Sequence, residues 1–247
     1  MIELCIIWLM LNTSPEGIKY AGIDIKGVRA VRLGEIATFT GFGETLKDSL
    51  ITVMRFTSES VNEVKQRLLD PIKEIVEGEP GMEVVLAGRD YPLHSTVLDS
   101  NWAQAEEKRD QSFTAAIARV KGENLMGDLV GQEIIYRYVL VNGGNVLLTA
   151  IDIPATVIEA RKILVRVLTT EGISPKPSDH ILHCSVARIS ALPQDGQKEV
   201  LNRYAGKIRR LRTNIAREPL KLKVGEVETV SGYDFFVAQN KFKGITK

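Results

Sequence analysis

The stretch Glu133–Ile151, EIIYRYVLVNGGNVLLTAI, decides the fold class of this chain. Two apolar and aromatic runs flank Asn142-Gly143-Gly144 within it. This pattern predicts a β-hairpin, because asparagine and glycine accept the positive φ angles of a tight turn. A hairpin joins antiparallel strands, so the stretch favours an antiparallel or mixed sheet over the parallel sheet of a doubly wound fold.

The segments around the hairpin predict further strands and four helices. The expected strands are 6–11, 20–25, 36–42, 50–56, 82–86, 91–98, 181–189, 220–230 and 233–238, and the expected helices are 58–78, 102–120, 154–170 and 194–216. Ser60 is the candidate N-cap of the first helix, with Glu63 three residues later, and Pro71 is expected to kink or split that helix. Strands mostly neighbour strands, which indicates an α+β fold.

The two halves of the chain on either side of residue 130 look alike. Each contains a helix, then a strand with a histidine, then a second helix. We therefore expect two pseudo-symmetric lobes, with helices packed outside and a cleft between the lobes. The expected unit is one bilobal domain over residues 1–247, in which residues 1–50 form an extension of unassigned role.

Composition excludes several classes of protein. The chain has 247 residues, 44% of them hydrophobic, and a formal net charge of 32 − 31 = +1. A mainly disordered chain and a globally basic nucleic-acid coat protein do not have these values. The longest apolar run, Leu4–Leu11, is too short for a bilayer, which needs about 20 residues, so we interpret it as a buried strand and expect no membrane contact. Cys5 and Cys184 lie far apart and form no disulfide framework, which favours the cytoplasm.

Two of the three histidines occur in similar local sequences. His94-Ser95-Thr96-Val97 and His183-Cys184-Ser185-Val186 both read histidine, any residue, hydroxyl residue, valine. Side chains at positions i and i+2 of a strand point to the same face. If the two strands lie together, two imidazoles and two hydroxyls therefore converge on one cleft, while Ser95 and Cys184 face the other way.

This set of side chains suits chemistry on a phosphoester. Two hydroxyls can donate hydrogen bonds to the non-bridging oxygens of a phosphoryl group. A neutral imidazole can accept a proton while a protonated one supplies a proton, since a histidine pKa of about 6.5 makes both forms available near neutral pH. The scheme requires no metal and no cofactor. We assign His94 as the acid and His183 as the base.

The paired His-x-Thr/Ser motifs resemble those of the 2H phosphoesterase superfamily, which has a bilobal α+β fold. The family includes RNA 2′,3′-cyclic phosphodiesterases, first described as 2′-5′ RNA ligases. The resemblance implies that His94 and His183 are catalytic and that Thr96 and Ser185 bind phosphoryl oxygens. In many members the second motif continues to an arginine, and Arg188 stands at this position. Arg188 is therefore a candidate for binding phosphate, with capping of the sheet edge as the alternative.

The resemblance covers residues 50–240, and the sequence departs from the family pattern in three places. Ser185 replaces the commoner threonine, Asp99 stands where members often continue with apolar residues, and about fifty N-terminal residues are extra. These differences leave the substrate open more than the reaction type.

Other residues have both a functional and a structural interpretation. Tyr233 and Phe235 are candidates for stacking on a nucleobase, with core packing as the alternative. A metal site from His180, His183 and Cys184 is disfavoured, because adjacent strand residues point to opposite faces; His180 is expected at the edge of its strand. The segment 198–223 is rich in Lys and Arg and either attracts a phosphate backbone or forms a solvated helix face.

The combined prediction is a cytoplasmic, monomeric, metal-independent phosphoesterase. Its expected substrate is the 2′,3′-cyclic phosphate end of RNA, or a related 2′-linked phosphodiester or nucleotide. Two alternatives remain open. One is a protein that binds an RNA end or a nucleotide without turnover, for which segment 198–223 provides affinity. The other is a small-molecule cyclic phosphodiesterase, for which residues 1–50 narrow the cleft.

Overall fold

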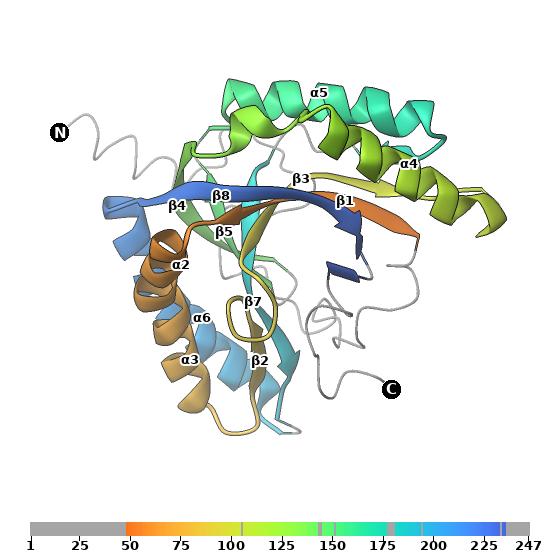
Figure 1. Ribbon diagram of the computed structural model, residues 1–247. Helices are drawn as coiled ribbons and strands as arrows, with labels where there is room; N and C mark the ends of the chain where they lie inside the picture. Colours follow the sequence, from red (N-terminus) through yellow and green to blue (C-terminus); the bar gives the residue numbers. More distant parts are fainter. Residues whose placement is uncertain are drawn as a thin grey trace, which may run out of the picture.

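A computed structural model describes residues 48–104, 106–142, 145–150, 152–176, 181–193, 195–232 and 234–235, and the fold is given for these residues (Figure 1). They form an eight-stranded sheet in the order β2-β7-β5-β4-β8-β1-β3-β6. Neighbouring strands in this sheet pair antiparallel. The prediction of an α+β fold with an antiparallel sheet is therefore confirmed. The expected strands before residue 48 lie outside the described residues.

The strands are β1 Ser49–Phe56, β2 Glu83–Leu86, β3 His94–Asn101, β4 Glu133–Asn142, β5 Asn145–Ala150, β6 Ser174–Lys176, β7 His183–Ala191 and β8 Leu220–Ser231. The helices are α2 Ser58–Val64, α3 Asp70–Glu77, α4 Arg109–Gly122, α5 Ala155–Thr170 and α6 Gln197–Arg217. A π-helical turn, Lys65–Leu69, connects α2 to α3, and 3-10 turns occupy Glu106–Lys108 and Gly127–Leu129.

The long strand β8 joins the two halves of the sheet. Its first residues, 220–223, pair with β4, and residues 224–231 pair with β1. In Figure 1, α4 and α5 cover one face of the half that contains β1 and β3, whereas α2, α3 and α6 pack beside the half that contains β7 and β2. The sheet thus has two differently covered halves; the pseudo-symmetry of the two lobes stays a prediction.

One hydrophobic core extends through both halves. Tyr136 and Leu148 from the predicted hairpin lie in it, together with Ile72 of α3, Leu164 of α5 and Ile208 of α6, and all five side chains are fully buried. Burial of each such side chain is worth about 1.5–3 kcal/mol. The hairpin therefore supplies part of the core that fixes helices of both halves to the sheet.

The predicted helix 58–78 is split near Pro71, as expected. The backbone N–H of Asp70 bonds to the carbonyl of Lys65, five residues earlier, in the π-helical turn before the proline. This wider turn accommodates Pro71, which lacks an N–H and would otherwise clash with the preceding turn. The predicted N-cap was wrong: Thr57, not Ser60, caps the helix, and its Oγ1 accepts from the Ser60 N–H.

The strands predicted at 91–98 and 181–189 and the helix predicted at 194–216 begin two or three residues late, and three other segments differ more from the prediction. Residues 174–176, expected in a turn-like stretch, form the edge strand β6 and pair with β3. Residues 234 and 235 are helical rather than part of a closing strand. The helix expected from Trp102 begins at Arg109, because the Trp102 backbone N–H bonds to the Asp48 carbonyl and its ring packs on Phe113.

Candidate active site

The two histidine motifs begin two strands that are not neighbours in the sheet. His94 is the first residue of β3 and His183 the first residue of β7, which are seventh and second in the strand order. The strands nevertheless meet at these ends. Ser95 Oγ donates to the His183 carbonyl at 2.7 Å, and Tyr91 OH donates to the Ser185 carbonyl at 2.7 Å. The sheet therefore curls so that the two motifs lie together.

Alternate residues of each motif point to opposite faces, as the strand period predicts. Ser95 and Cys184 are fully buried on the core side, where Tyr136 OH donates to Ser95 Oγ at 2.9 Å. Burial raises the pKa of the Cys184 thiol to about 12, so this thiol is not a nucleophile. His183 and Ser185 are partly exposed on the other face.

Each motif contains a β-bulge at the same position. Between β1 and β3 the pairing moves from Leu98 to Thr96, so Val97 is the extra residue. Between β5 and β7 it moves from Ala187 to Ser185, so Val186 is the extra residue. Both are the valine that follows the hydroxyl residue, and a bulge inverts the alternation of faces beyond it.

The second bulge returns Arg188 to the face of His183 and Ser185. Ser185 pairs with Leu147 and Arg188 with Asn145, two residues apart on β5, and cross-strand partners share a face. Arg188 Nε donates to Asn145 Oδ1 at 2.6 Å. In an uninterrupted strand Arg188 would face away, so the bulge makes the phosphate-binding role geometrically accessible.

The equivalent residue after the first bulge is Asp99. It pairs with Ile51, while Thr96 pairs with Val53, so Asp99 shares the face of Thr96. Its carboxylate lies 3.3 Å from Lys176 Nζ on the edge strand β6. The charge of Asp99, which departs from the family pattern, is thus balanced by Lys176 of β6, a strand that the sequence did not predict.

His94 is almost completely buried, and its ring orientation is set by one hydrogen bond. Its Nδ1–H donates to the Pro92 carbonyl at 2.8 Å, which leaves Nε2 as a proton acceptor in the neutral ring. The pKa of His94 is lowered to about 4, mainly by burial; the bond to Pro92 opposes this shift, and the charges of His183 and Arg55 add to it. His94 is therefore neutral near pH 7.

His183 is less buried than His94, and its pKa is also lowered. The main cause is again burial, followed by the positive charge of Arg161 on α5. Across the strand pair, His183 lies opposite Thr149 of β5. Because the charge of His183 acts on His94, the two imidazoles lie close enough to influence each other's protonation.

The two aromatic residues proposed for base stacking have different outcomes. Tyr233 lies outside the described residues. Phe235 is fully buried, and its ring meets the His94 ring edge-on at a centroid distance of 4.7 Å. A buried ring offers no open face to a nucleobase, so core packing, the alternative interpretation, describes Phe235 in this structure; it forms a wall against His94.

The sequence did not identify Arg55, which lies directly opposite His94 on β1. Its Nη2 forms an ion pair of 2.6 Å with Glu228, and its guanidinium lies 5.1 Å from the centre of the Phe235 ring. No local motif marks this arginine, because only the register of β1 against β3 brings it to the site.

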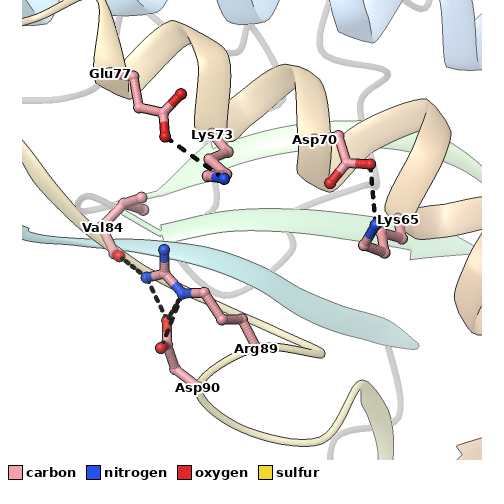
Figure 2. Close-up of polar contacts among 7 residues, drawn as sticks. All are labelled: Lys65, Asp70, Lys73, Glu77, Val84, Arg89 and Asp90. Carbon is pink, nitrogen blue, oxygen red and sulfur yellow. Dashed lines mark hydrogen bonds and ion pairs between the residues drawn. The ribbon is translucent and has the colours of Figure 1, made fainter.

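The loop between β2 and β3 positions the first motif. Arg89 Nη2 donates to the Val84 carbonyl at 2.8 Å and to Asp90 Oδ2 at 2.6 Å (Figure 2). Asp90 Oδ2 also accepts from the Leu86 N–H. Gly88 has a φ of 75°, which favours glycine in this turn. The turn places Tyr91 against β7.

Figure 2 also draws the ion pairs Lys65–Asp70 and Lys73–Glu77 of the helical segment 65–77. Both pairs are exposed and contribute little to stability.

Part of the basic segment 198–223 is used within the protein. Arg203 and Lys207 of α6 both bind the carboxylate of Glu79, which is 2% exposed. Arg212 is buried, and Lys221 lies 3.8 Å from Glu133. Fewer cations are therefore available to a phosphate backbone than the sequence indicates.

In the described part of the chain, no group of three His, Cys, Asp or Glu side chains is arranged to hold a metal ion. His180 lies outside these residues. No helix in the same part is both long and apolar enough to cross a membrane.

No family model matches the chain, and no curated protein matches it in sequence. The fold of the chain does match solved structures. The MHV ns2 PDE domain is 15% identical with a TM-score of 0.39, over 61% of this chain and 87% of that domain. Kluyveromyces marxianus Usb1 is 11% identical with a TM-score of 0.46, over 75% of this chain and 95% of Usb1. Its structure with uridine monophosphate is 10% identical with a TM-score of 0.44, over 76% and 95%.

Proposed function

We propose that this chain is a metal-independent phosphoesterase that hydrolyses the 2′,3′-cyclic phosphate end of RNA or a related 2′-linked phosphodiester. The observation that carries the proposal is the matched geometry of the two motifs. Their strands come from opposite halves of the sheet and meet at the histidines, and both have the same bulge after the hydroxyl residue. Two motifs that each supply an imidazole and a hydroxyl suit acid–base catalysis of attack on a phosphoryl group.

We propose the reverse of the acid–base assignment made from the sequence, with His94 as the base. The Pro92 carbonyl keeps the proton of the neutral ring on Nδ1, so Nε2 has the lone pair, and a pKa of about 4 makes His94 a poor acid at neutral pH. His183 is then the acid. A bound phosphodiester carries a negative charge, and this charge favours the protonated form of His183.

In the proposed step, a water oxygen attacks phosphorus while its proton passes to Nε2 of His94. The bond from phosphorus to the 2′ or 3′ oxygen breaks, and His183 gives that oxygen its proton. Thr96, Ser185 and Arg188 bind the non-bridging oxygens, whose charge grows in the transition state. The products are a phosphomonoester and a free hydroxyl.

The test is hydrolysis of a nucleoside 2′,3′-cyclic phosphate with EDTA present, comparing the wild type with His94→Ala and His183→Ala. Each substitution removes one proton transfer, so turnover is expected to fall by at least about 10²-fold. His94→Asn is a second variant at the buried position, because its amide can still donate to the Pro92 carbonyl. Arg166→Ala, on α5 with a side chain that is 74% exposed, is the control and should keep full activity.

Turnover retained in both single variants, with cooperative unfolding unchanged, would disprove the two-histidine mechanism. The two alternative functions are separated by substrate. Turnover of a mononucleotide but not of an RNA oligomer with the same cyclic end indicates a small-molecule phosphodiesterase. Salt-dependent RNA binding without any product indicates a binding protein. The internal ion pairs of Arg203 and Lys207 weigh against the last function.

A further inference from the structure

Side chains, rather than backbone pairing, connect the two motif strands. The carbonyls of residues 181, 183 and 185 belong to alternate residues and point to one edge of β7. The carbonyl of residue 181 accepts from Arg161 Nη2 at 2.8 Å. The carbonyls of residues 183 and 185 accept from Ser95 Oγ and Tyr91 OH, each at 2.7 Å. On this edge β2 and Ala87, the residue that follows it, pair with β7 only from Val186 onward. The distance between the two histidine strands therefore depends on these three donors.

Arg161 is the charged member of the three, and it contacts both strands. Its Nε donates to the Val97 carbonyl at 2.8 Å, and its Nη2 donates to the Ile181 carbonyl at 2.8 Å. Val97 is the bulge residue next to Thr96, and Ile181 lies two residues before His183. The side chain comes from α5 and is 4% exposed. One buried guanidinium thus connects the backbone of the first motif to the backbone of the second.

We propose that Arg161 is a positioning residue, which holds the two histidines at their working separation by binding a main-chain carbonyl of each motif strand. The kinetic part of this proposal rests on the proposed function. A guanidinium suits the task because its donors diverge from a rigid plane, so two carbonyls are held at a fixed distance. A lysine ammonium keeps the charge but lacks this planar fork.

The charge of Arg161 also has an effect that a merely structural residue would not have. Among the described residues, Arg161 from α5 is the charged group that lowers the pKa of His183, and His183 in turn lowers the pKa of His94 on β3. Removing the charge of Arg161 removes a cause that lowers the pKa of His183. Replacement by methionine should therefore raise this pKa, whereas replacement by lysine should leave it nearly unchanged.

The experiment compares Arg161→Lys and Arg161→Met with Arg166→Met, a control on the same helix whose side chain is 74% exposed. Displacement of reacting groups by about 1 Å costs on the order of 10²-fold in rate. We expect Arg161→Lys to lower kcat by about 10- to 100-fold with KM little changed. The control should match the wild type.

Nuclear magnetic resonance without substrate supplies the second readout. The His183 ring signal should titrate at a higher pH in Arg161→Met than in the wild type, and the amide signals of both motif strands should shift in Arg161→Lys. If the wild type hydrolyses no cyclic phosphate but these signals behave as expected, the proposed function fails and the positioning role stands.

Two results would overturn the positioning role. One is a folded Arg161→Lys protein with the kcat of the wild type. The other is a lower unfolding temperature in both variants, with no change in the His183 titration or in the kcat of the folded fraction, which is the behaviour of a residue that only adds stability.

Discussion

The hydrogen bond between Nδ1 of His94 and the Pro92 carbonyl determines the tautomer of the neutral ring. The Pro92 carbonyl can only accept, so Nδ1 carries the proton and Nε2 has the lone pair. Tyr91 and Phe235 meet the ring edge-on and help to keep it dry, and this burial is the main reason that its pKa lies near 4. The same environment keeps His94 unprotonated near pH 7, which makes it unsuitable as a proton donor.

The acid–base assignment predicts a dependence on the leaving group. A phosphodiester with an acidic phenol as leaving group needs no proton from an acid. His183→Ala should therefore lose much less activity on this diester than on the cyclic nucleotide, whereas His94→Ala should lose about 10²-fold or more on both. The measurement is kcat/KM for the two substrates. If His94→Ala is the variant that the phenol ester rescues, the assignment is the reverse.

The sequence predicted the site residues that depend on local order and missed those that depend on register. The period of two along a strand placed His183 and Ser185 on one face without knowledge of the fold. Arg55 and Arg161 reach the site from other elements, and no spacing within their own segments indicates this. The two bulges were also missed, because one extra residue in a ladder leaves no mark in composition.

At the scale of elements, the strongest predictions came from residues whose backbone chemistry is unusual. Asn142-Gly143-Gly144 marked the hairpin of β4 and β5, and Pro71 marked the break between α2 and α3. The prediction failed where a tertiary contact outweighed a local signal. Residues 174–176 are rich in turn formers, yet their backbone groups pair with β3, which makes them a strand.

The cap of α2 provides a stability test at this scale. Thr57 Oγ1 accepts from the Ser60 N–H, while Ser60 Oγ accepts from the Lys223 N–H at 2.9 Å, so the two hydroxyls have different tasks. Thr57→Ala should lower the free energy of unfolding by about 1 kcal/mol, and Thr57→Ser should nearly preserve it. Urea unfolding measures both. A Thr57→Ala protein as stable as the wild type would contradict the capping role.

For the whole molecule, the curl of the sheet brings titratable groups out of water. His94 and His183 lie where the two halves meet, and burial lowers the pKa of both. Glu79 connects the segment after α3 to α6; hydrogen bonds from Arg203, and then Lys207, lower its pKa. These groups make the free energy of unfolding depend on pH in different windows, because the histidines protonate in the unfolded chain near pH 6.5 and the carboxylate only near 4.5.

The free energy of unfolding should therefore fall as the pH is lowered from about 7 towards 4, before the carboxylates contribute. In this window the unfolded chain binds a proton at position 94 and the folded chain does not, so stability rises with pH. A fall in the pKa of His94 from 6.5 to about 4 corresponds to about 3 kcal/mol across the window. His94→Asn cannot titrate and still offers a donor to Pro92, so its stability should change less with pH. Urea unfolding at several pH values measures the difference. Equal slopes for the two proteins between pH 6.5 and 4.5 would show that His94 is not held neutral by burial in the fold.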